Sequence, residues 1–93
     1  MQFGEHMVDQ SDWRLRGQAK YLKGVALQWR VYKQFAPHWD HDHCEFCWAK
    51  FMDRDLANVL REGYVTLDGD RWICSQCYDD FKEMFEWNVQ TPK

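Results

Sequence analysis

The chain has 93 residues, of which 45% are hydrophobic and 17% aromatic, and its formal net charge at pH 7 is −3. This length predicts one small domain with a modest core, and the apolar content excludes an intrinsically disordered chain. No apolar run approaches the roughly 18 residues that span a bilayer, and residues 1–10 lack the basic and apolar regions of a secretion signal. We therefore expect a cytoplasmic protein without membrane contact, with residues 1–10 as a flexible N-terminus and residues 11–93 as a single domain.

The first predicted element is a long amphipathic helix within residues 11–36. A serine at the start is a good N-cap, and apolar side chains then recur at three- and four-residue steps over residues 12–35. Gly17 and Gly24 weaken this helix by about 1 kcal/mol each relative to alanine, which predicts a close contact or a bend there. Pro37 ends it, since the residue before a proline is disfavoured in the helical region.

A short helix and a β-hairpin are predicted next. In "FMDRDLANVLREG" an aspartate cap precedes three apolar residues on one helical face, and Gly63 serves as the C-terminal stop. In "YVTLDGDRWIC" the pair Asp68 and Gly69 lies between β-branched and aromatic residues. This pattern is typical of a tight hairpin turn.

The last predicted element is a helix in "SQCYDDFKEMFEW". Apolar residues recur in it at helical spacing, and Asp79 and Asp80 are expected in its first turn, where the helix dipole favours negative charge. The fold class that follows is α+β, in which the long N-terminal helix packs on a compact module over residues 41–88.

The four cysteines are the strongest functional signal. They form two Cys-x-x-Cys pairs separated by 26 residues: Cys44, Cys47, Cys74 and Cys77. Two intervening residues let the backbone turn so that both sulfurs point to one site, and two such turns supply the four thiolates that zinc prefers. We therefore predict one structural Zn²⁺ bound by all four cysteines, with no open position for water or substrate.

Other interpretations of the cysteines stay open. Two redox dithiols or four buried structural thiols fit the same residues, and iron in a rubredoxin-like site uses the same ligand set. The pair at Cys44 does not begin a helix after a parallel strand, as a thioredoxin-like dithiol requires. Zinc is favoured because cytoplasmic cysteines stay reduced and the sequence has no feature of a redox partner.

The order of elements resembles a treble-clef zinc finger, with a knuckle that carries "CEFC", a loop, a hairpin and a helix whose start carries "CSQC". The resemblance covers residues 41–88 and implies the fold of a zinc module. A common knuckle has glycine after its second cysteine, whereas Trp48 follows Cys47 here. The strings "DWRLRGQ", "KYLKGV", "WDHDHCEFCWAKF" and "RWICSQC" also resemble a group of small bacterial proteins without an assigned activity.

The string "WDHDHC" resembles the Asp-His-Asp-His string of some treble-clef nucleases, in which a histidine activates water. In that family the string lies between the cysteine pairs, whereas here residues 40–43 precede Cys44. A metal-dependent nuclease is therefore a minor alternative, and we predict a protein without enzymatic activity. Simpler roles for these residues are open. His43 could replace a cysteine as ligand, His41 could form a hydrogen bond to a sulfur, or the segment could be a solvated loop without a role.

The charge distribution and the tryptophans suggest a macromolecular partner. From Trp13 to Ala36 there are six basic residues and no acidic one, whereas from Pro37 onward twelve acidic residues face six basic ones. Basic and aromatic residues together can bind nucleic acid, but the net charge of −3 is far from the basic balance of such a module. Six tryptophans exceed what a small core needs. We therefore expect an interface with a protein partner, as in an adaptor, inhibitor or immunity-type protein, with nucleic-acid binding as the alternative.

Overall fold

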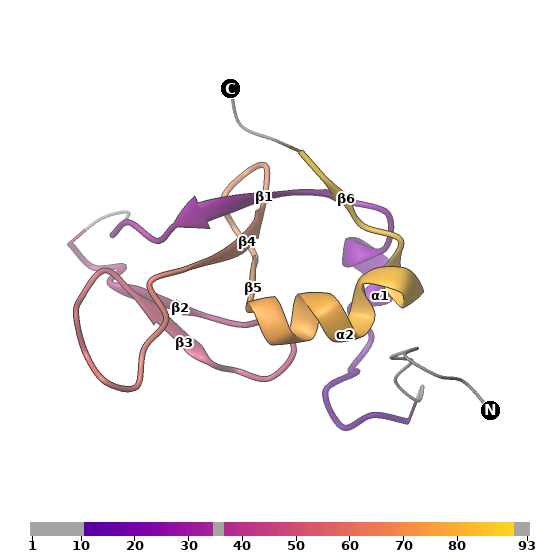
Figure 1. The fold of residues 1–93 in the computed structure, drawn as a ribbon, viewed down its shortest axis with the longest axis horizontal. Helices are drawn as coiled ribbons and strands as arrows, with labels where there is room; N and C mark the ends of the chain where they lie inside the picture. Colours follow the sequence, from indigo (N-terminus) through magenta and orange to yellow (C-terminus); the bar gives the residue numbers. More distant parts are fainter. Residues whose placement is uncertain (1–10, 35–36, 91–93) are drawn as a thin grey trace.

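The computed structural model describes residues 11–34 and 37–90 (Figure 1). The elements in chain order are α1 (Ala19–Leu22), β1 (Ala26–Val31), β2 (His41–His43), β3 (Lys50–Met52), β4 (Glu62–Thr66), β5 (Trp72–Ile73), α2 (Ser75–Phe85) and β6 (Asn88–Val89). One sheet has the strand order β5-β4-β1-β6, and a second pairs β2 with β3. The α+β class is confirmed. Neither helix in the described residues has the length and apolar character that a membrane crossing requires.

The prediction of a long N-terminal helix is wrong. Among the described residues 11–34, only the four residues of α1 are helical, and residues 26–31 form β1. Gly17 and Gly24 have φ values of +90° and +77°, in the left-handed region that a right-handed helix excludes. The chain leaves α1 at Gly24, whose N–H donates to the carbonyl of Phe85 at 2.7 Å. It then continues as a strand that pairs antiparallel with β4 and parallel with β6.

The prediction of a short helix after Met52 is also wrong, because β3 and a loop occupy this stretch. Met52 N–H donates to the carbonyl of Leu60 at 3.0 Å, and Leu60 N–H donates to the carbonyl of Lys50 at 2.8 Å. These bonds hold both ends of the loop against β3. A helix this short is marginal unless its apolar face packs, and here Leu56 is 53% exposed.

The hairpin and the C-terminal helix are confirmed. The strands β4 and β5 pair antiparallel, and Gly69 in the turn between them has a φ of +81°. The helix α2 begins after Cys74, whose sulfur accepts a hydrogen bond from the N–H of Cys77. The prediction that Asp79 and Asp80 lie in the first turn is wrong, because the helix begins at Ser75 and its first turn has no acidic residue.

An aromatic core joins the first cysteine pair to α2. Phe46 lies between Cys44 and Cys47, and its ring stacks on Phe81 of α2 with 4.8 Å between centroids. It also meets Phe85 edge to face at 5.3 Å. The fully buried side chains are Tyr32, Phe46, Phe51, Phe81, Phe85, Leu22, Leu27, Ile73, Val65, Cys44 and Cys77. The core therefore places the residues between the first two cysteines directly against the helix that carries the fourth.

Candidate metal centre

The four cysteines converge where the ends of β2 and β5 meet the start of α2. Their Sγ atoms all lie within 4.8 Å of one another, and those of Cys47 and Cys74 are 3.6 Å apart. A tetrahedral ion with metal–sulfur bonds of about 2.3 Å holds its sulfurs about 3.8 Å apart, whereas the two sulfurs of a disulfide lie about 2.05 Å apart. The structure thus brings together the four predicted ligands and positions them to bind one metal ion.

A tight turn over residues 44–49, which we call the knuckle, aims the first two sulfurs. Trp48 N–H donates to the carbonyl of Cys44 at 3.2 Å, and Cys44 N–H donates to the carbonyl of Ala49 at 2.7 Å. Trp48 has a φ of +70°, the conformation that favours glycine. The turn therefore keeps its geometry without a glycine, at the expense of backbone strain at Trp48.

This strain gives a direct prediction. Trp48→Gly is expected to be more stable than Trp48→Ala by about 1 kcal/mol, because only glycine adopts the left-handed φ without steric conflict. Both variants lack the indole, so the comparison isolates the backbone term. Urea unfolding of the two proteins measures the difference. Equal stability of the two variants would show that the knuckle does not constrain this residue.

The second cysteine pair caps α2 and is tied to the first pair by backbone N–H groups. Cys77 N–H donates to Sγ of Cys74, and Cys74 N–H donates to Sγ of Cys44, each at 3.4 Å. Phe46 N–H also donates to Sγ of Cys44 at 3.4 Å. Such donors and the positive end of a helix dipole stabilise the thiolate form, which is the form that binds metals.

The sulfurs are coupled electrostatically. Hydrogen bonds from Cys74 and Cys77 lower the pKa of Cys44. The pKa values of Cys74 and Cys77 are raised, first by their hydrogen bonds to Cys44 and also by its charge. Four thiolates at this spacing repel one another unless a cation lies between them. Zinc is a divalent ion that binds soft thiolate ligands, so it fits this donor set.

Arg14 also contacts the site, although no pattern in the sequence marks this residue. Its Nη1 donates to Sγ of Cys77 at 3.5 Å and to Oδ2 of Asp80 at 2.8 Å. Its Nε and Nη2 donate to the two oxygens of Asp12, each at 2.9 Å, and the guanidinium lies 4.5 Å from the centroid of Phe81. The hydrogen bond to Asp12 raises the pKa of Arg14, so the charge beside Cys77 is permanent. The uneven charge distribution in the sequence did not predict this contact.

The histidines do not join the cysteine cluster. Among the described residues, the group positioned to bind a metal contains the four cysteines and neither His41 nor His43. Nδ1 of His41 lies 2.7 Å from Oδ1 of Asp40, and the two imidazole rings meet edge to face at 5.0 Å. The alternative in which His43 replaces a cysteine as ligand therefore finds no support in the geometry.

Comparisons with protein-family models, with curated proteins and with solved structures found no match. The resemblance to a group of small bacterial proteins is therefore unsupported, and the treble-clef assignment stays a prediction. What the fold and the site define is a small α+β protein whose four clustered cysteines are positioned to hold one metal ion.

Proposed function

We propose that this is a non-enzymatic zinc-binding protein, in which one structural Zn²⁺ stabilises a surface that binds a protein partner. The observation that carries the proposal is the cluster of four sulfurs, contributed by two segments 26 residues apart and all within 4.8 Å of one another. Four thiolates complete the tetrahedral coordination of zinc, so no position remains for a reacting water. The ion would then have a structural role.

The small size of the core supports this role. Structural zinc binding contributes about 10–16 kcal/mol in small finger peptides near neutral pH, whereas whole domains are stable by about 5–15 kcal/mol. In this chain the ion would join the knuckle to the start of α2. We also propose that residues 41–88 form a treble-clef zinc module. The order of the knuckle, the hairpin and the helix along the chain supports this.

Exposed tryptophans support a partner-binding surface. Trp13 is 68% exposed, Trp48 59%, Trp39 44% and Trp29 38%. Burial of an indole is strongly favourable, and tryptophan and arginine contribute more than their share of binding energy at protein interfaces. An adaptor, an inhibitor or an immunity-type protein would each use such a surface.

The alternative of nucleic-acid binding is weakened by the internal use of two basic residues. Arg14 pairs with Asp12 and Asp80, and Arg16 donates to the carbonyls of Glu45 and Phe46 at 3.1 and 3.2 Å. Titration with mixed DNA and RNA at low and moderate salt tests the preference for a protein partner over nucleic acid. Tight binding that falls steeply with salt would favour nucleic acid over protein as the partner.

Native mass spectrometry of protein purified without added metal tests the proposal. We expect one zinc ion per chain, four reduced cysteines and any co-purified protein partner in the same measurement. A metal-free chain, a disulfide-linked chain or bound iron would overturn the zinc assignment. Cleavage of nucleic acid that requires Mg²⁺ and is lost in His41→Ala would overturn the non-enzymatic assignment.

A further inference from the structure

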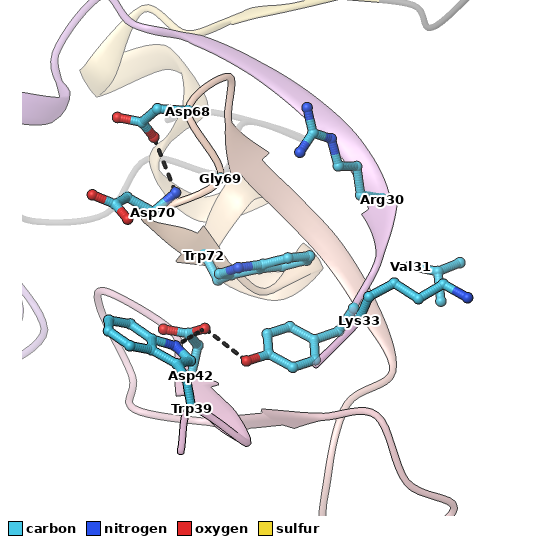
Figure 2. Close-up of a pocket in the computed structure, with 10 residues that line it drawn as sticks. Arg30, Val31, Lys33, Trp39, Asp42, Asp68, Gly69, Asp70 and Trp72 are labelled. Carbon is cyan, nitrogen blue, oxygen red and sulfur yellow. Dashed lines mark hydrogen bonds between the residues drawn. The ribbon is translucent and has the colours of Figure 1, made fainter. Parts of the chain in front are cut away.

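A hollow of about 380 Å³ lies between the end of β1, the strand β2 and the β4–β5 turn (Figure 2). Three aromatic side chains from separate segments form its inner walls: Tyr32, Trp39 and Trp72. Tyr32 and Trp72 are buried, with 5.0 Å between ring centroids, and Trp39 is 44% exposed. Figure 2 shows Trp39 across the hollow from Trp72. An entering group would therefore contact mainly Trp39, with the small exposed parts of Tyr32 and Trp72 behind it.

Asp42 connects two of these walls. Its Oδ2 accepts hydrogen bonds from the hydroxyl of Tyr32 at 2.8 Å and from Nε1 of Trp39 at 3.0 Å. Burial and the bond to Asp42 raise the pKa of Tyr32, so the phenol keeps the proton that it donates. Within the described part of the chain, no hydrogen bond reaches Oδ1. One carboxylate oxygen thus fixes the rings, while the other can still accept a hydrogen bond or face a cation.

The charges around the hollow favour a cation over an anion. Asp68 and Asp70 line its rim at the β4–β5 turn, but Figure 2 shows both carboxylates directed away from the rings, which leaves Asp42 as the carboxylate beside them. Two basic residues also line it, but Figure 2 shows Lys33 pointing away from the rings. Nε of Arg30 donates to the side chain of Gln28 at 2.8 Å. The part enclosed by the rings therefore combines aromatic faces with a carboxylate, a combination that attracts ammonium groups through cation–π and Coulomb interactions.

We propose that this hollow binds an organic ammonium cation, with the charge between Trp39 and Trp72 and beside Oδ1 of Asp42. The cation can belong to a small amine or to a lysine side chain of a partner protein. None of the ring and carboxylate residues of the hollow is a cysteine, so the site is distinct from the metal centre and does not depend on the identity of the ion.

Isotope-labelled protein, purified with its bound metal, allows a direct test by NMR. Choline is titrated while the indole N–H resonances are followed, with uncharged 3,3-dimethylbutan-1-ol, which has the same shape, as the matched ligand. We expect choline to shift the resonance of Trp39 with a dissociation constant of about 1 mM, and the alcohol to bind at least about tenfold more weakly. Equal affinity for the two ligands, or no saturable shift with choline, would overturn the proposal.

Two variants locate the cation. Asp42→Asn keeps an acceptor for Tyr32 and Trp39 but removes the charge, and Trp39→Leu removes one ring at the exposed edge. Each is expected to weaken choline binding by about tenfold. Trp13→Leu, at a 68% exposed indole outside the hollow, is the control and should bind as before. Unchanged binding in both Asp42→Asn and Trp39→Leu would refute the site. Unaltered zinc content in these proteins separates this result from a failure of the zinc proposal.

A second ligand pair distinguishes the two sources of the cation. Nα-acetyl-trimethyllysine methylamide is compared with choline, since both carry the same ammonium group. Tighter binding of the lysine derivative supports a side chain of a partner protein, and tighter binding of choline supports a small amine. Binding of neither ligand contradicts the proposal as a whole.

Discussion

Complete removal of the metal ion is expected to unfold the region that the four cysteines join, which comprises the knuckle, the β4–β5 hairpin and α2. Without the ion, the coupled thiols of Cys44, Cys74 and Cys77 would retain protons or repel one another, and the knuckle would lose its link to the helix. The stabilisation lost is about 10–16 kcal/mol, which exceeds the stability that a core of this size supplies alone. This is the largest effect that we predict.

Circular dichroism and thermal melting before and after chelation measure this effect. A reducing agent is present throughout, so that disulfides cannot replace the ion. We expect loss of helical signal and of the cooperative transition, and recovery of both on addition of zinc but not of magnesium, which prefers oxygen ligands. Unchanged spectra and melting in protein proven metal-free would contradict the proposal that the ion stabilises this fold.

The parts of the fold that the sequence predicted depend on short-range signals. The pair Asp68 and Gly69 specifies a turn by itself, and the strands beside it are its neighbours in the chain. Each Cys-x-x-Cys pair specifies a local turn that directs its two sulfurs to one site. These elements could therefore be predicted without knowledge of the rest of the fold.

The segment that became β1 could not be predicted in this way, because its partners are distant in sequence. Leu27 pairs with Thr66 of β4 on one side and with Val89 of β6 on the other. Apolar spacing alone fits both a helix and this strand, and pairing on both edges decides between them. The sequence signal for the strand is the run of β-branched and aromatic residues after Gly24. Tertiary pairing thus overrode the helical pattern.

Contacts across the chain also explain why the role of Arg14 was missed. Its partners Cys77 and Asp80 lie more than sixty positions away, with sequence separations of 63 and 66. No local pattern marks such a residue. Arg14 and Arg16 look equivalent in the sequence, yet only the first contacts a sulfur.

The second large effect is expected for Arg14→Met. The side chain of Asp80 is 6% exposed, and the variant removes one cation that pairs with it, while the amide of Gln76 still donates to its Oδ1 at 3.1 Å. Removal of one partner from a buried ion pair costs about 3–5 kcal/mol, because the remaining charge stays in a poorly solvated place. The Arg14 side chain is 12% exposed and Asp80 keeps another donor, which places our expectation near the lower limit, at about 3 kcal/mol. Urea unfolding of the metal-loaded protein measures this loss.

Zinc retention separates a role at the metal centre from a purely structural one. Four thiolates and Zn²⁺ carry a net charge of −2, and Arg14 supplies a positive charge and an N–H at Cys77. Arg14→Met should therefore also transfer zinc to a competing chelator at least about tenfold faster, since outer partners of metal ligands alter affinity by about 10–100-fold. Arg14→Lys, which keeps the charge, should recover part of this retention. Arg16→Met, which loses backbone contacts but no sulfur contact, should release zinc at the original rate. If Arg14→Met and Arg16→Met released zinc equally fast, the charge beside Cys77 would have no part in holding the ion.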